Sequence, residues 1–251
     1  MLIKSGDWML KILTASMFLL SVILSCSVTR PQKAEETYID PAKAISLIKD
    51  KKAVIVDTMS YLECMDHRIP GSLCIALEEF DNNSPALLKD KKHPVIFYCE
   101  SDECTRAGQT FGKARKLGYE NIYILEGGLP AWKRAGNEVE SLDRIKREPV
   151  VSIKPHKLKS FIREKKNLFI LDIRTEALYE AGHIDGAVNV PLYVLHKGLK
   201  EIPKDRPVLV VDENGKRSFL ACCYLINNGF KDVMRLYGGM KHEELQKGKK
   251  G

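Results

Sequence analysis

The chain has 251 residues, of which 44% are hydrophobic and 29% charged, with 17 glycines and 11 prolines. This composition excludes a collagen-like or low-complexity protein, a protein with many membrane spans, and a chain that is disordered throughout. The length is that of one or two ordinary globular domains. The net charge of +7 comes mainly from scattered lysines without interleaved aromatic residues, so we expect no nucleic-acid partner.

The first part of the chain has the layout of an export signal. Lys4 and Lys11 precede an apolar run over residues 12–24, which is shorter than the roughly 20 residues that a membrane span needs. The run ends in the segment from Ile23 to Cys26, which resembles the bacterial lipobox, where the cysteine is lipidated and becomes the new N-terminus.

We therefore expect residues 1–26 to be a signal with Cys26 as the lipidation site, and residues 27–36 to be a polar tether. The body of the protein would then face the periplasm as a lipoprotein of the bacterial cell envelope. The alternative is an uncleaved N-terminal membrane anchor. Translation could start at Met1 or at Met9, because Met9 would begin a more compact signal.

The rest of the chain is an internal repeat. Corresponding segments recur in the same order at a nearly constant offset, which predicts two homologous domains over residues 37–140 and 150–248, joined by an exposed linker over residues 141–149. The matching pairs are residues 53–57 and 168–172, Gly71 and Gly186, residues 94–99 and 207–212, Arg106 and Arg217, Gly118 and Gly229, and Gly127-Gly128 and Gly238-Gly239.

Each copy alternates short apolar runs with helical stretches, which indicates an α/β fold with a mainly parallel sheet and helices on both faces. Ligands of such sheets bind beyond the carboxyl ends of the strands. In the first copy, Cys99 follows the strand over residues 94–98 and precedes a helix over about residues 105–117. A cysteine beside a helix N-terminus faces unpaired backbone N–H groups, which favour the thiolate, and the thiolate is the nucleophile.

Several motifs of both copies together resemble rhodanese domains. The first copy contributes the loop from Cys99 to Arg106, residues 117–128 and Ala131-Trp132, with Asp57 and residues 67–72 similar to two upstream signatures of the family. The second copy contributes residues 172–174, Tyr179, residues 182–191 and Gly238-Gly239. The resemblance covers about residues 37–248.

This resemblance implies a sulfurtransferase. Cys99 would take a sulfane sulfur from a donor as a persulfide, and a thiol or protein acceptor would remove it. Backbone amides of the loop would stabilise the persulfide, and Arg106 would be the loop-closing cation at the helix start. The active-site loop would then comprise Glu100, Ser101, Asp102, Glu103, Cys104 and Thr105. We expect no cofactor and no metal, because two thiolates without a further neighbouring ligand do not complete a tetrahedral set.

The second copy departs from the family pattern. Asp212 stands where the nucleophile belongs, although Arg217 and the usual loop length are kept. A carboxylate cannot carry sulfane sulfur, so we predict that this degenerate site is inactive and that its domain covers or orients the first. Two-domain sulfurtransferases usually keep the active cysteine in the second copy, so the order here is reversed.

The loop of the first copy is unusually long. Six residues separate Cys99 from Arg106, against four between Asp212 and Arg217. A wider loop could accept a larger oxyanion, as in the phosphatases that share this fold, and a phosphatase or an arsenate reductase is therefore an alternative. Three carboxylates of the loop argue against this alternative, namely those of Glu100, Asp102 and Glu103. They raise the pKa of the thiol and repel dianions. Thiosulfate is also a dianion, so these carboxylates favour sulfur donors of low charge.

The remaining cysteines allow several interpretations. Cys104 could be a resolving thiol that releases sulfide from the persulfide, a partner in a protective disulfide with Cys99, or a loop residue without a role. Cys64 and Cys74 could form a disulfide in an oxidising compartment. Two further cysteines lie within a helix over residues 219–227 and are predicted to be core, namely Cys222 and Cys223.

Two functions of different class stay open. One is an exported sulfurtransferase that uses Cys99; the other is a non-catalytic adaptor of the same fold, or a thiol-redox protein that uses Cys99 and Cys104. An adaptor does not require Cys99 together with Arg106, so this pair favours the enzyme.

Overall fold

The structure is a computed structural model that describes residues 37–101 and 103–242. The predicted signal and tether, with Cys26, lie outside the described residues, and so does Asp102. Of the helices in the described ranges, none combines the length and the apolar character needed to cross a membrane.

The first half of the described chain forms one five-stranded parallel sheet. Its hydrogen-bonded strands follow the order β1-β5-β4-β2-β3. The non-consecutive order requires crossover connections, which the helices supply. The strands are β1 (Tyr38–Ile39), β2 (Val54–Asp57), β3 (Leu73–Cys74), β4 (Val95–Tyr98) and β5 (Ile122–Leu125).

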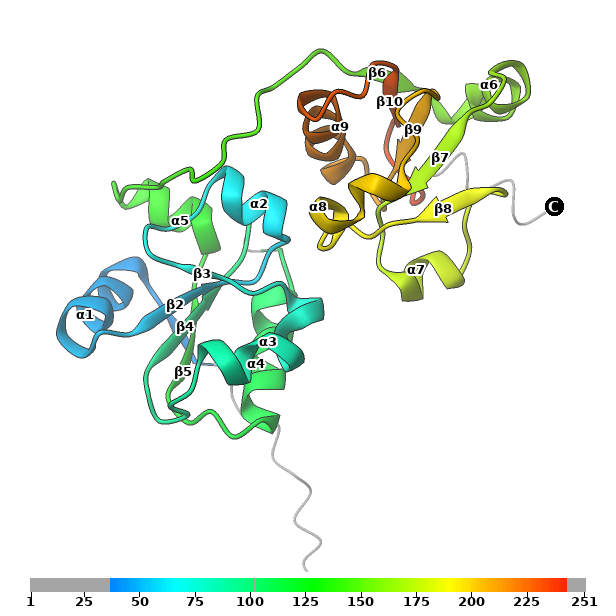
Figure 1. Ribbon diagram of the computed structural model, residues 1–251. Helices are drawn as coiled ribbons and strands as arrows, with labels where there is room; N and C mark the ends of the chain where they lie inside the picture. The colour runs from blue at the N-terminus through cyan, green and yellow to red at the C-terminus, as the bar shows by residue number, and fades with distance from the viewer. Residues whose placement is uncertain (1–36, 102, 243–251) are drawn as a thin grey trace, which may run out of the picture. The chain divides into compact units, whose positions relative to one another are not determined.

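Helices cover both faces of this sheet, as Figure 1 shows for α1 and α5 on one side and α3 and α4 on the other. The first helix begins where Asp40 accepts a hydrogen bond from the Lys43 N–H at 2.7 Å and Pro41 occupies the first turn. The helices are α1 (Pro41–Lys51), α2 (Tyr61–Asp66), the 3-10 turn η1 (Leu77–Glu79), α3 (Phe80–Leu87), α4 (Arg106–Lys116) and α5 (Gly128–Arg134).

The second half repeats this topology with a sheet of order β6-β10-β9-β7-β8, again parallel throughout. Its strands are β6 (Val151–Ile153), β7 (Phe169–Asp172), β8 (Ala187–Asn189), β9 (Val208–Val211) and β10 (Val233–Leu236). Its helices are η2 (Pro155–Lys157), α6 (Leu158–Glu164), α7 (Glu176–Glu180), α8 (Leu195–Gly198), η3 (Leu199–Glu201) and α9 (Arg217–Asn227). The predicted fold class, two parallel α/β units, is confirmed.

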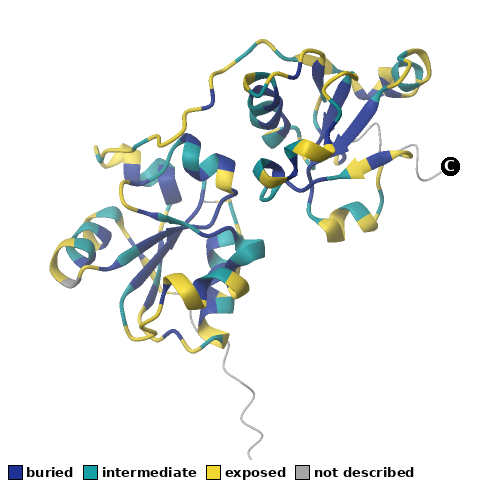
Figure 2. Ribbon diagram, viewed as in Figure 1, coloured by how far each residue is buried: buried dark blue, intermediate teal, exposed yellow. Residues whose placement is uncertain are grey.

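Both faces of the central strands are buried. Along β9, Val208 and Val210 belong to one hydrophobic cluster, whereas Leu209 and Val211 belong to another. Successive side chains of a strand point to opposite faces, so a strand covered on both sides must be apolar at every position. Figure 2 shows the central strands in the colour of buried residues. This requirement explains the continuous apolar runs in the sequence.

The segment after α5, where the exposed linker is predicted, is exposed at most of its positions, but several of its residues are bound to the end of α2. Glu140 forms an isolated antiparallel bridge with Arg68, and the N–H of Leu142 donates to Met65. Ile145 is only 5% exposed, and its N–H donates to the Asp66 carboxylate at 2.9 Å. An apolar residue within a charged stretch was the available signal, and buried partners bind this segment to the end of α2.

The backbone at the start of α5 lies close to the backbone of the loop that follows β4. The N–H of Leu129 donates to the carbonyl of Cys99 at 2.9 Å, and Gly128 has a φ of +52°. A Cβ atom at Gly128 would lie 2.4 Å from that carbonyl oxygen. Only glycine combines this conformation with this contact.

We predict that Gly128→Ala lowers the free energy of unfolding by about 2–4 kcal/mol, because it adds both strain and a backbone clash. The matched control is Gly112→Ala in α4, where an added Cβ meets nothing within 4 Å. That change should stabilise the helix by about 0.5–1 kcal/mol. Urea unfolding measures both, and similar effects of the two changes would contradict the packing described here.

Candidate active site in the loop after β4

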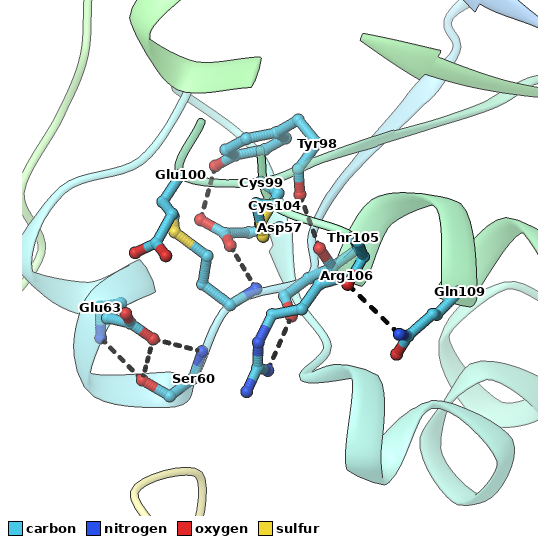
Figure 3. Close-up of a disulfide and its surroundings, with 12 residues drawn as sticks. Asp57, Ser60, Glu63, Tyr98, Cys99, Glu100, Cys104, Thr105, Arg106 and Gln109 are labelled. Carbon is cyan, nitrogen blue, oxygen red and sulfur yellow. Dashed lines mark hydrogen bonds between the residues drawn. A yellow bond between two sulfur atoms is a disulfide. The ribbon is translucent and has the colours of Figure 1, made fainter. Parts of the chain in front are cut away.

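Cys99 lies where the sequence places it, at the carboxyl end of a central parallel strand. Strand β4 ends at Tyr98 and helix α4 begins at Arg106, so the loop between them carries Cys99 at the edge where ligands of such sheets bind. Cys99 is 2% exposed, and Glu103 and Thr105 on the loop are exposed. Figure 3 shows this loop and its surroundings.

A disulfide joins Cys99 to Cys104 across the loop (Figure 3). The N–H of Cys104 donates to the Ser101 carbonyl at 3.2 Å, which closes a turn between the two cysteines. The two cysteines therefore pair, and Cys99 is in its oxidised, disulfide-bonded form in the structure. Their pairing gives Cys104 a chemical partner, in contrast to a loop residue without a role.

Arg106 is held at the start of α4 by a carboxylate that the sequence analysis missed. Its two terminal nitrogens donate to the two oxygens of Glu78, each at 3.0 Å, and one also reaches the Thr58 carbonyl at 3.5 Å. Such two-point pairs fix the plane of a guanidinium group. Glu78 belongs to η1, and nothing in the sequence distinguishes it from its neighbour Glu79.

Beside the loop, Asp57 and Tyr98 form a buried hydrogen-bond network. The two residues are register partners at the ends of β2 and β4, and the Tyr98 hydroxyl donates to Asp57 Oδ2 at 2.7 Å. The N–H of Met59 donates to the other Asp57 oxygen at 2.8 Å. The Tyr98 oxygen accepts the N–H of Ile69 at 3.0 Å and lies 3.1 Å from Ser72 Oγ. The network joins the two strand ends to the segment before β3.

Burial raises the pKa of Asp57 from its ordinary 3.8 to about 7, and the hydrogen bonds from Met59 and Tyr98 offset this effect only in part. Burial, together with the nearby Asp57 carboxylate, also raises the pKa of Tyr98 above its ordinary value. Tyr98 is therefore a neutral donor, and Asp57 titrates near neutral pH.

The loop of the second half shows what this architecture does with an anion. The Asp212 carboxylate is 3% exposed and accepts three backbone hydrogen bonds. They come from the N–H groups of Gly215 at 2.8 Å, Arg217 at 2.8 Å and Ser218 at 3.0 Å. Unpaired amides at a helix start stabilise negative charge. Asp212 thus supplies from its own side chain the anion that these amides bind.

Arg217 contacts two carboxylates of the first repeat. Its guanidinium lies 3.0 Å from Glu63 and 3.0 Å from Glu100, the residue that follows Cys99. Burial would lower the pKa of Arg217, but these two carboxylates outweigh it and raise the pKa. Burial would likewise raise the pKa of Glu63, but Arg217 and the hydrogen bonds from Ser60 bring it below its ordinary value. One of the carboxylates expected to charge the loop is therefore paired.

The other cysteines of the described residues fall into two groups. Cys64 and Cys74 form a disulfide that ties α2 to β3, as an oxidising compartment allows. Cys222 and Cys223 are free and fully buried within α9, as predicted. Burial raises the pKa of the Cys222 thiol far above its ordinary value, so it is not a nucleophile. Among residues 37–101 and 103–242, no cluster of three or more histidine, cysteine or carboxylate side chains could hold a metal ion.

Known proteins that are similar to this chain include members of one domain family and sulfurtransferases. A family model described as "Rhodanese-like domain" matches residues 40–135 and 154–242, one segment in each repeat. A "Sulfurtransferase" from Allochromatium vinosum is 34% identical over 91 residues, covering 36% of this chain and 85% of that protein. The "Putative sulfur carrier protein YrkF" of Bacillus subtilis is 31% identical over 156 residues, covering 61% of this chain and 83% of that protein.

A solved structure, the thiosulfate sulfurtransferase from Pseudomonas aeruginosa, is similar with a TM-score of 0.42 and 20% identity. The similarity covers 81% of this chain but only 43% of that one.

Asp57 generates a prediction about stability and pH. Between about pH 4 and pH 7 the folded protein keeps a proton that the unfolded chain has lost, so the free energy of unfolding should fall as the pH rises, by roughly 1–4 kcal/mol. Asp57→Asn should flatten this dependence. Urea unfolding across the pH range measures it.

The control is Asp172→Asn at the corresponding strand end, where the carboxylate instead pairs with Arg174 at 2.7 Å. This variant should keep the slope, because it retains Asp57. An unchanged slope in Asp57→Asn would show that another group causes the pH dependence.

Proposed function

Since the chain belongs to the rhodanese-like family and its sulfurtransferase relatives support sulfur transfer as its activity, we propose that it carries sulfane sulfur as a persulfide on Cys99. A thiol or another thiophilic acceptor, free or on a protein, then removes the sulfur. The observation that carries the proposal is a cysteine in the loop between β4 and α4, at the position where Asp212 of the second repeat collects three amide hydrogen bonds.

The chemistry follows from this position. After the disulfide is reduced, the Cys99 thiolate attacks the outer sulfur of a donor, and the donor's leaving group departs with the electron pair of the broken bond. The persulfide that forms is an anion, which the amides at the start of α4 stabilise. Arg106, whose charge is offset by Glu78, is held in place at the start of that helix.

The second repeat supports the site without taking part in the chemistry. The Asp212 carboxylate accepts the hydrogen bonds of the backbone N–H groups in its own loop, and a carboxylate cannot hold sulfane sulfur. Arg217 offsets the charge of Glu100 next to Cys99. We propose that this positioning explains why the degenerate loop keeps its arginine.

The charge of the loop bears on the donor. Glu100 is paired, but Glu103 is exposed and Asp102 lies outside the described residues. Remaining negative charge repels dianions more than monoanions. We therefore propose donors of low charge, such as a persulfide, a polysulfide or a partner protein, in preference to thiosulfate.

We predict that the reduced protein converts cyanide to thiocyanate with a sulfane donor, and that Cys99→Ser lowers the rate at least a thousandfold, because serine cannot form a persulfide. Colorimetric detection of thiocyanate measures the rate. With an arenethiosulfonate, a monoanion, kcat/KM should exceed the value for thiosulfate.

The control is Cys223→Ala, which removes a free thiol that lies outside the loop and should leave the rate within about twofold. Turnover that survives in Cys99→Ser would refute the assignment. A strong preference for thiosulfate would refute only the argument about donor charge.

A thiol-redox function is the second candidate, and the Cys99–Cys104 disulfide is the observation that favours it. In that case the pair would exchange electrons with dithiols, and Cys99 would take no sulfur from any donor. The thiocyanate assay separates the two, because disulfide exchange produces no thiocyanate.

For the N-terminal segment, we propose export and lipidation at Cys26, on the basis of the basic start, the apolar run and the motif that ends in Cys26. The protein would then be tethered to the bacterial cell envelope and face the periplasm, where disulfides form. The two disulfides of the first repeat agree with such a compartment.

We predict that the mature protein from a bacterial host begins at Cys26 and carries acyl chains, as mass spectrometry of its N-terminal peptide would show. Cys26→Ser should abolish acylation, whereas the neighbouring change Ser27→Ala should not. An unprocessed N-terminus without lipid would instead establish the uncleaved anchor.

A further inference from the structure

The disulfide shows that the sulfur atoms of Cys99 and Cys104 meet within the folded first repeat. Both cysteines belong to the loop between β4 and α4, whose ends are fixed by the sheet and by the Arg106–Glu78 ion pair. A thiol at Cys104 is therefore within reach of any group carried on the Cys99 sulfur. A nucleophile held beside its target reacts far faster than one in solution.

The longer loop of the first repeat accommodates this second thiol. The Asp212 loop has two fewer residues, and the N–H groups three, five and six positions after Asp212 all bind its carboxylate. In the first repeat Arg106 corresponds to Arg217, and Cys104 lies in the longer stretch before it; the Cys104 N–H binds the Ser101 carbonyl at 3.2 Å. Its amide thus serves a turn that brings the second sulfur to the first.

We propose that Cys104 discharges the Cys99 persulfide as sulfide, which gives the protein a persulfide-reducing activity; this inference rests on the proposed carrier role of Cys99. The Cys104 thiol attacks the inner sulfur, on Cys99, and the bond between that sulfur and the sulfane sulfur breaks. The sulfane sulfur leaves as hydrosulfide with the electron pair of the broken bond and is thereby reduced. The Cys104 sulfur is oxidised, and the two cysteines end as the Cys99–Cys104 disulfide.

An external dithiol must then restore the two thiols. Its thiolate has easier access to the Cys104 sulfur, because Cys104 is half-buried between the exposed Glu103 and Thr105, whereas Cys99 is 2% exposed. Attack on Cys104 makes Cys99 the leaving group, and its thiolate departs next to the start of α4, where negative charge is stabilised. The second thiol of the dithiol releases Cys104 and completes the reductant's own disulfide.

The full cycle converts one sulfane sulfur and one dithiol into one sulfide and one disulfide. The persulfide would thus have two fates. An acceptor that reaches it first receives the sulfur. If none does, Cys104 releases the sulfur as sulfide. The disulfide in the structure corresponds to the stage after sulfide has left and before the dithiol acts.

The test uses the full chain in detergent, without oxygen and without added thiols. The protein is reduced with a phosphine, freed of it, and treated with a small excess of an arenethiosulfonate, whose leaving group is a sulfinate. Neither a thiol nor sulfide comes from this donor, so any sulfide comes from the carried sulfur. Sulfide is measured together with the Cys99–Cys104 disulfide by peptide mass spectrometry.

We expect the wild type to release about one sulfide per Cys99 and to form an equal amount of the disulfide. Cys104→Ser and Cys104→Ala should keep the persulfide on Cys99 and release sulfide at least tenfold more slowly. Cys223→Ala, which retains both loop cysteines, should behave as the wild type.

The outcomes separate the two levels of the account. If the persulfide is equally long-lived in the wild type and in both Cys104 variants, the discharge reaction is wrong while the carrier role stands. Sulfide released without an equal amount of disulfide also overturns the discharge reaction. If Cys99 takes up sulfur in none of these proteins, the carrier role itself is wrong.

Discussion

The proposed roles of both repeats depend on one interaction, the binding of an anion by backbone amides in the loop between a central strand and the following helix. A parallel strand that ends at the start of a helix leaves several N–H groups without partners, and they need negative charge or water. In the second repeat the Asp212 carboxylate meets this need with three hydrogen bonds. In the first repeat the same position carries Cys99, so the same need would favour a thiolate or a persulfide.

The two repeats meet this constraint in different ways. A carboxylate in the loop binds the amides permanently and needs no ligand, so the second repeat can be stable without chemistry. The side chain of its arginine, Arg217, pairs with Glu63 and Glu100. In the first repeat the corresponding arginine is held by Glu78 instead. The two equivalent arginines thus have different carboxylate partners, each outside its own loop.

Much of the fold could be predicted from the sequence, because doubly covered strands require continuous apolar runs and because the repeat shows each element twice. The strand before Cys99 and the helix after it lie within a residue or two of the expected bounds. The partners of Arg106 and Arg217 could not be predicted, since any of many surface glutamates could reach a long cation. Neither could the buried part of the linker, where Ile145 packs on residues distant in the sequence.

The two disulfides also could not be predicted from the sequence pattern alone. Spacing alone left open whether Cys99 and Cys104 form a disulfide or Cys104 is a loop residue without a role, because pairing depends on where the Cβ atoms point. The presence of this disulfide makes the oxidation state of the loop part of the proposed function, since Cys99 would be a free thiol only after reduction. Burial excludes Cys222 and Cys223 from this chemistry.

The central claim is that Cys99 carries the sulfur, and the mass of its peptide tests this most directly. The reduced protein would be exposed separately to thiosulfate, to polysulfide and to buffer, and then digested without reductant. We predict a gain of one sulfur atom on the Cys99 peptide of Cys104→Ser with at least one donor, and none in Cys99→Ser. A Cys99 peptide that stays unmodified with every donor would contradict it.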